Sequence, residues 1–194
     1  NPPSQAHAEA ARLRKRLTDV ASIDFFGAPG REVAEGQVSS IEAKLRPDQL
    51  TPAAKRPTLQ IEAYSNRVWV TRTGIHIDRI ASGWLIRRFI DAKARFKFVA
   101  SKGYQPKPTE LRFDMYEAEF THEGDSCTFE VLVARFGLED RALGVIAEIV
   151  HDIDLKDARF GRSEAPGVDR MIAGIAMANK EDEARLAVGS SVFD

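Results

Sequence analysis

The chain has 194 residues, and its 28 basic and 29 acidic side chains give a formal net charge of −1. This balance excludes a nucleic-acid-binding module that acts through bulk positive charge, and the single cysteine excludes an intramolecular disulfide framework. A chain of this length can bury a core without a disulfide or metal staple. No apolar run approaches the roughly 18 residues of a membrane-spanning helix, and no signal peptide is visible, so we expect a cytoplasmic protein with no membrane partner.

Residues 1–46 are predicted to form a helical hairpin. Apolar residues recur at helical spacing over 4–22, and glycine and proline at 27–30 separate this helix from a second one over about 31–45. Neither helix can bury much apolar surface alone, which favours either packing on the rest of the chain or a homodimer. Prolines recur in the segment that follows, so 47–66 is predicted to be an extended linker.

Residues 67–194 are predicted to form the main domain. We expect strands at 67–72, 95–99 and within 111–120. We expect helices at about 77–90, 127–136, 140–150, 168–179 and 181–188. A polar loop is expected over about 152–167. The fold class is therefore α+β, a mostly helical domain with a small sheet whose strand order the pattern does not set, preceded by the helical hairpin.

The densest polar cluster lies where the first strand of this domain turns into a helix. Arg72 ends the strand, His76 and Arg79 share a helix face, and Arg87 falls two turns further on. A helix start attracts anions, and the guanidinium fork matches two oxygens of a tetrahedral oxyanion. The pattern indicates an oxyanion site, unless these arginines only pair with carboxylates such as Asp78 on an amphipathic helix.

A metal centre is a second interpretation of the polar residues. His76, Asp78, His122 and Asp154 offer nitrogen and oxygen donors that suit iron, manganese or zinc, although their spacing matches no established metal motif. His122 lies in a turn before a predicted helix, where a capping role is the alternative. His151 ends a helix, where the dipole favours an imidazolium. Phosphate loops, dinucleotide fingerprints and the common hydrolase motifs are absent from the sequence.

Several segments resemble the bacterial chromate-resistance family of the ChrB type. The most specific block is 72–91, which contains Ile75-His76-Ile77-Asp78-Arg79-Ile80-Ala81-Ser82 and Trp84-Leu85-Ile86-Arg87-Arg88-Phe89-Ile90-Asp91. Segments 96–99, 122–129 and 146–154 also agree with the family. The resemblance covers most of the chain.

The resemblance implies the C-terminal region of a chromate-responsive regulator that controls a chromate-resistance operon. Promoter DNA would bind an N-terminal region that longer members carry and that is missing here. Chromate is a tetrahedral dianion, and on this hypothesis Arg72, Arg79 and His122 bind it, with His76 and Arg87 in support. Binding would change the angle between hairpin and main domain.

Two other functions stay open at this point. One is a metal-dependent oxidoreductase or chromate-detoxifying enzyme that uses His76, Asp78, His122 and Asp154, so whether the chain is an enzyme is not decided. The other is an interaction module that dimerises through the hairpin.

Overall fold

A computed structural model describes residues 2–24, 34, 37–38, 41–42, 45, 57–100, 104–115 and 118–194. Its elements are α1 (Pro2–Ile23), η3 (Ile61–Tyr64), β1 (Val68–Arg72), α3 (Ile77–Leu85), η4 (Ile86–Ile90), β2 (Arg95–Val99), β3 (Glu110–Arg112), α4 (Thr128–Arg135), α5 (Arg141–Leu155), α6 (Ala165–Ala178) and α7 (Asp182–Ser190). The expected fold class, mostly helical α+β with a small sheet, is confirmed.

The sheet has three parallel strands in the order β2-β1-β3. β1 is central, with β2 and β3 along its two edges, and Trp69, Val70 and Thr71 on it are fully buried. Parallel strands end at the same edge of a sheet, so the residues that follow β1 and β3 are brought together. That edge carries the candidate site.

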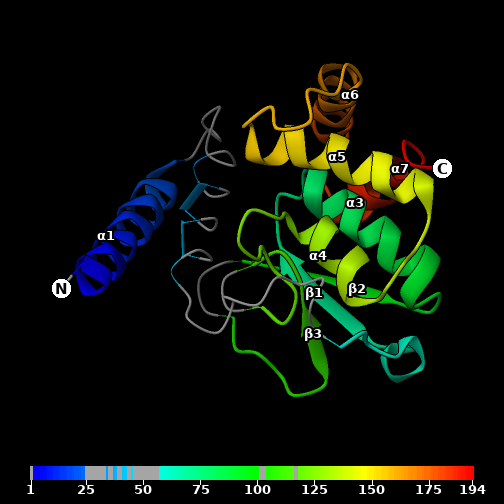
Figure 1. Ribbon diagram of the computed structural model, residues 1–194, viewed down its shortest axis with the longest axis horizontal. Coiled ribbons are helices and arrows are strands. Elements are labelled where there is room, and N and C mark those ends of the chain that lie inside the picture. The colour runs from blue at the N-terminus through cyan, green and yellow to red at the C-terminus, as the bar shows by residue number, and fades with distance from the viewer. Residues whose placement is uncertain are drawn as a thin grey trace.

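Helix α3 follows β1 and forms the centre of the helical layer (Figure 1). It packs against α4, α5 and α7. Its contact with α7 is close, since a Cβ added at Gly83 would lie 2.7 Å from Leu186 Cδ1 and one added at Gly189 would lie 2.7 Å from Ile80 Cγ2. The absence of side chains at these two positions lets the helices approach each other.

Several predicted boundaries shift in the structure. The helix expected over 77–90 changes to a π-helical turn at Ile86–Ile90, α5 continues to Leu155, and α6 begins already at Ala165. The polar loop is therefore shorter than expected and covers 156–164. None of the helices in the described ranges is long and apolar enough to cross a membrane.

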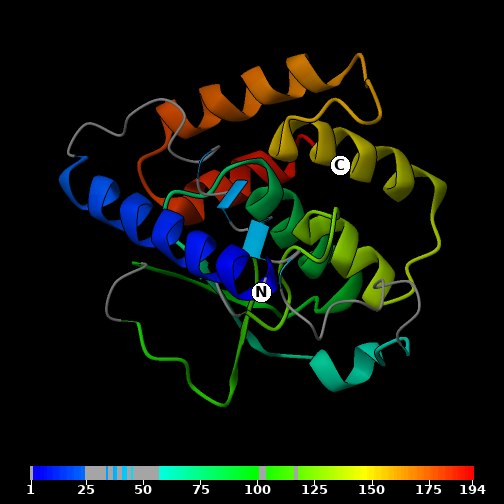
Figure 2. The ribbon, with the colours of Figure 1, turned by 60° about the vertical axis from the view of Figure 1, so that its left-hand side comes forward.

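The first predicted helix is confirmed as α1, which lies at one side of the domain (Figures 1 and 2). Of the second predicted helix, residues 34, 37, 38, 41, 42 and 45 are described and are helical. The rest of it, residue 46 and residues 47–56 of the predicted linker lie outside the described residues. Arg14 on α1 pairs with Glu42 at 2.6 Å. The division into three segments and the homodimer stay predictions.

Candidate metal centre

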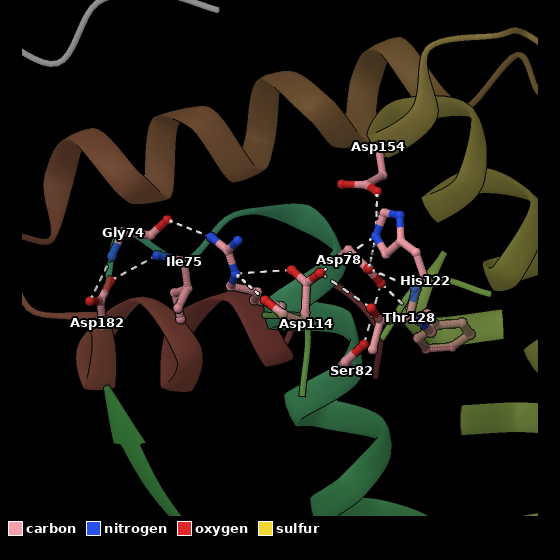
Figure 3. A network of polar contacts seen from close by, with 11 residues as sticks. Gly74, Ile75, Asp78, Ser82, Asp114, His122, Thr128, Asp154 and Asp182 are labelled. Carbon is pink, nitrogen blue, oxygen red and sulfur yellow. Dashed lines mark hydrogen bonds and ion pairs between the residues drawn. The ribbon is translucent and has the colours of Figure 1, made fainter. Parts of the chain in front are cut away.

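Four polar side chains from separate parts of the chain converge at the carboxyl edge of the sheet (Figure 3). Asp78 stands in the first turn of α3, and Asp114 follows β3. His122 lies in the segment between β3 and α4, and Asp154 lies in the last turn of α5. The convergence depends on the parallel pairing of β1 with β3 and on the packing of α3 against α4 and α5.

The imidazole of His122 lies at the centre of this cluster and contacts its three carboxylates. Its Nε2 lies 3.3 Å from Asp78 Oδ2, 3.4 Å from Asp114 Oδ1 and 3.3 Å from Asp154 Oδ2, and His122 is only 2% exposed. One nitrogen carries at most one proton, so a proton cannot bridge it to all three carboxylates.

These separations match those between ligands of one small cation. Two donors bound at about 2.1 Å to a tetrahedral ion such as zinc lie about 3.4 Å apart. One donor atom each from Asp78, Asp114 and His122 lies within 4.8 Å of the other two. Asp154 Oδ2 also lies 3.3 Å from this nitrogen, but Asp154 is not one of the donors that lie within 4.8 Å of one another.

Asp78 is held firmly by the helix that it faces. Its Oδ2 accepts a hydrogen bond from the backbone N–H of Thr128 and its Oδ1 accepts one from that of Phe129, both at 2.9 Å. The Ser82 hydroxyl donates to Oδ1 at 3.3 Å. Asp78 therefore caps the N-terminus of α4 from α3 and is fixed in place without any ligand.

Asp114 is held by a cation and by a hydroxyl. The guanidinium Nε of Arg79 lies 2.9 Å from its Oδ2, and the Thr128 hydroxyl donates to its Oδ1 at 3.2 Å. Burial raises the pKa of Asp114, but the charge of Arg79, followed by the contact with His122 and the charge of Arg72, outweighs burial and holds the pKa well below its usual range. Asp114 therefore stays ionised.

The cluster concentrates negative charge around one imidazole. Burial lowers the pKa of His122, but Asp114, Asp78 and Asp154 raise it more strongly, so the pKa lies well above its usual value. Burial and the charge of Asp78 raise the pKa of Asp154 to about 7, although His122 acts in the opposite direction. A divalent cation would replace the protons that these groups otherwise retain.

Helix α7 fixes the loop that leads from β1 into α3. Asp182 Oδ2 accepts a hydrogen bond from Gly74 N, and its Oδ1 accepts one from Ile75 N, both at 2.9 Å. Gly74 has a φ of 76°, which favours glycine. Arg79 Nη1 in turn donates to the Gly74 carbonyl at 3.5 Å. Asp182 of α7 thus holds the loop whose carbonyl positions Arg79, the arginine that pairs with Asp114.

The structure places the residues of the expected oxyanion site in two groups. Arg79 and His122 meet at Asp114, and Arg72 acts on the same carboxylate through its charge. His76 precedes α3 and is half-buried, whereas Arg87 is exposed and lies over the ring of Phe96 at 5.0 Å from its centroid. The anion-binding role of these residues stays a prediction.

Of the expected metal ligands, Asp78 and His122 come together, with Asp114, as donors within 4.8 Å of one another. Asp154 contacts His122 at 3.3 Å but is not one of these donors. His76 is not among the donors that meet within 4.8 Å in the described part of the chain. The sequence interpretation missed Asp114. The available signal was its position directly after a predicted strand, because β1 also ends at a polar cluster and parallel pairing joins the two strand ends.

A second buried histidine lies outside this cluster. His151 is fully buried, and its Nδ1 lies 2.7 Å from Glu130 Oε2 while its Nε2 lies 3.3 Å from Asp157 Oδ2. Burial lowers the pKa of His151, but Glu130 and then Asp157 raise it above its usual value. Because a carboxylate lies at each ring nitrogen, His151 joins α5 to α4 and to the loop at 156–164.

Comparison with known proteins places this site in a family. The sequence model of the family described as "ChrB, C-terminal domain" matches residues 69–194. The chain belongs to the ChrB family. Protein ChrB of Cupriavidus metallidurans is 34% identical over 197 residues, which cover 96% of this chain and 60% of that relative. No solved structure matches. All four residues of the cluster lie within the part that the ChrB family model covers.

Proposed function

We propose that this ChrB-family chain is the ligand-responsive domain of a chromate-resistance regulator, and that it responds through a divalent cation held by Asp78, Asp114 and His122. The supporting observation is the contact of one buried imidazole nitrogen with three carboxylates at 3.3–3.4 Å. The cluster is more than a group of acids, because a nearly fully buried histidine points into it. The link to chromate resistance comes from the family resemblance.

Electrostatics favours a cation over an anion at His122. Two unit charges about 4 Å apart interact by about 4 kcal/mol at an effective dielectric constant near 20. A dianion beside His122 would meet about twice this repulsion from each ionised carboxylate, whereas a divalent cation would gain about twice this energy from each. The positive side of the site is at Arg79, which faces Asp114 from the β1–α3 side. An oxyanion would therefore approach from the arginines and would reach His122 only through a bound cation.

The donor set narrows the choice of metal. Carboxylates suit manganese and magnesium, and an imidazole shifts the preference toward iron and zinc. One imidazole with two carboxylates therefore suits Mn²⁺, Fe²⁺ or Zn²⁺. The cation would supply positive charge and open coordination positions, while the protein orients its ligands through the backbone amides of α4 and through Arg79.

Calorimetric titration of chelator-stripped protein with Mn²⁺, Zn²⁺ and, under anaerobic conditions, Fe²⁺ tests the metal centre. We expect one cation per chain and at least tenfold weaker binding after Asp114→Asn or His122→Gln. Asp157→Asn is the matched control, since Asp157 also lies 3.3 Å from a buried histidine nitrogen but stands outside the cluster. Equal losses in Asp114→Asn and Asp157→Asn, or no binding by the wild type, would contradict the proposal.

The regulatory part is tested in a full-length ChrB protein with a promoter reporter. His122→Gln at the equivalent position should abolish the response to chromate while protein abundance is unchanged. A normal chromate response in that variant would show that regulation does not depend on this site.

A further inference from the structure

The sheet has two outer strands, and the chain covers the outer edge of only one of them in its described part. On β3, Arg112 N donates to Glu119 Oε2 at 2.7 Å and Arg112 O accepts from Phe120 N at 3.2 Å, so the segment at 118–120 covers that edge. The other outer strand is β2, whose strand partner is β1.

The pairing with β1 determines which backbone groups of β2 point outward. Arg95 N donates to β1 at 3.1 Å and Val99 O accepts from β1 at 3.0 Å, so the N–H and C=O groups of Arg95, Lys97 and Val99 point toward β1. Those of Phe96 and Phe98 point away from it, because successive residues of a strand alternate. None of these four outward groups has a hydrogen-bond partner among the described residues. The edge of β2 therefore offers two donors and two acceptors to an added strand.

The two faces of β2 differ in chemistry. Phe96 and Phe98 lie on the same face as Trp69 and pack, half-buried, against the core. Arg95 and Lys97 alternate with them and lie on the opposite face. A strand added beside β2 would place every second side chain next to the phenylalanine rings and the others next to the cations. A segment that fits this edge would therefore alternate apolar and acidic residues.

Positive charge beside this edge is not neutralised within the described ranges. Arg87, Lys93 and Arg95 are exposed, and none of the three forms an ion pair with a described residue. Arg88, by contrast, pairs with a carboxylate at 3.2 Å. The Arg87 guanidinium lies 5.0 Å from the centroid of the Phe96 ring, which places one of the three charges directly at the edge strand. The charge of this surface thus complements an acidic partner.

A second copy of this chain is a poor occupant of the edge. Two β2 strands that overlap fully about a two-fold axis are antiparallel, and the two Lys97 side chains would then lie directly opposite each other. Like charges in this position destabilise a strand pair. An acidic segment of a different protein meets no such repulsion.

We propose that the outer edge of β2 binds an extended acidic segment of a partner protein, which adds to the sheet as a fourth strand. Backbone hydrogen bonds to Phe96 and Phe98 supply the affinity. The cations Arg87, Lys93 and Arg95 select acidic partners. This interaction does not depend on the metal centre proposed above.

Fluorescence polarisation with labelled peptides tests the binding. The probe is a capped, fluorescein-labelled peptide of eight alternating glutamate and valine residues. We expect the wild-type chain to bind it at least about tenfold more tightly than a matched peptide with lysine in place of glutamate. The same glutamate peptide N-methylated at every amide should also bind at least about tenfold more weakly. The first comparison measures the effect of charge, and the second measures that of the backbone hydrogen bonds.

Charge reversal supplies the matched variants. Arg87→Glu combined with Arg95→Glu should weaken binding of the probe by at least about tenfold, because both exposed cations lie beside the edge. Arg141→Glu combined with Arg170→Glu changes the net charge equally, but these exposed residues lie on α5 and α6. Binding by this control should stay within about twofold of the wild type. Circular dichroism checks that both double variants fold.

Amide hydrogen exchange followed by nuclear magnetic resonance locates the bound peptide. In the free chain, the N–H groups of Phe96 and Phe98 should exchange faster than that of Lys97, which is bonded to β1. A saturating amount of the probe should slow exchange at Phe96 and Phe98 by at least about tenfold.

Several results would overturn the proposal. They are no binding of the acidic peptide, equal binding of the lysine or N-methylated peptide, and binding that leaves exchange at Phe96 and Phe98 unchanged. Equal losses in the two double variants would also contradict it, because net charge alone would then account for the binding. A mixed-sequence DNA duplex that binds through Arg87 and Arg95, when the acidic peptide does not bind, would assign these cations to nucleic acid instead.

Discussion

The substitution Asp78→Asn tests whether this carboxylate holds the start of α4 independently of any cation. Asp78 is 2% exposed and accepts two backbone hydrogen bonds at 2.9 Å. An asparagine keeps one acceptor oxygen, but its amide N–H₂ then faces a backbone N–H donor. Losing a charge-assisted hydrogen bond costs about 1.5–3 kcal/mol, and the buried N–H left without a partner adds about 1–3 kcal/mol.

We therefore expect Asp78→Asn to lower the free energy of unfolding by about 3 kcal/mol, which corresponds to a Tm lower by roughly 6–12 °C in a chain of this size. Urea unfolding followed by circular dichroism, with a chelator present, measures the loss. Asp140→Asn is the control: Asp140 accepts from Ala142 N and Leu143 N at the exposed start of α5, where asparagine caps equally well, so the change should stay within about 0.5 kcal/mol. Similar losses in both variants would refute this reasoning.

Three further predictions concern the framework of the domain. Burial raises the pKa of Asp91, but hydrogen bonds from three backbone amides and from the indole of Trp69 lower it by more than burial raises it. The pKa of Asp91 therefore lies below 3.8 in the folded chain. The stability that the ionised Asp91 contributes is present above about pH 4 and is lost as the pH falls through its folded pKa. Between pH 6 and pH 2, the free energy of unfolding should therefore fall less steeply in Asp91→Asn than in the wild type. Gly83→Ala places a Cβ 2.7 Å from Leu186 and should destabilise the chain by about 1–3 kcal/mol in urea unfolding, and a neutral effect would show that α7 can shift freely. Cys127 is fully buried, and burial followed by nearby carboxylates raises the pKa of its thiol, so Ellman's reagent should modify it only after unfolding; rapid reaction in the native protein would contradict this burial.

The fold follows from the sequence where the signal is local. The helical spacing of α1, the β-branched run of β1 and the broad apolar face of α3 each predict an element that the structure contains. The strand order does not follow, because it depends on which distant strands pair with Val68–Arg72. The π-helical turn after Leu85 is likewise a tertiary effect, since residues 86–90 continue the apolar pattern of the helix before them.

The site shows the same division between local and distant information. Asp78 and Arg79 could be identified because they stand together at a strand-to-helix junction. Asp114 reaches them only through the pairing of β3 with β1, and its φ of 44° turns the chain away from the strand in a way that the residue type alone does not reveal. His122 and Asp154 were noticed for their chemistry, but their shared contact depends on how α5 packs against α3.

The most direct test of the central claim is anomalous diffraction from crystals of the chain loaded with Mn²⁺, Co²⁺ or Zn²⁺. We predict one anomalous peak about 2.0–2.2 Å from His122 Nε2 and from carboxylate oxygens of Asp78 and Asp114. A loaded crystal with no peak at this position, or with its strongest peak elsewhere on the chain while His122 keeps its three carboxylate contacts, would contradict the account.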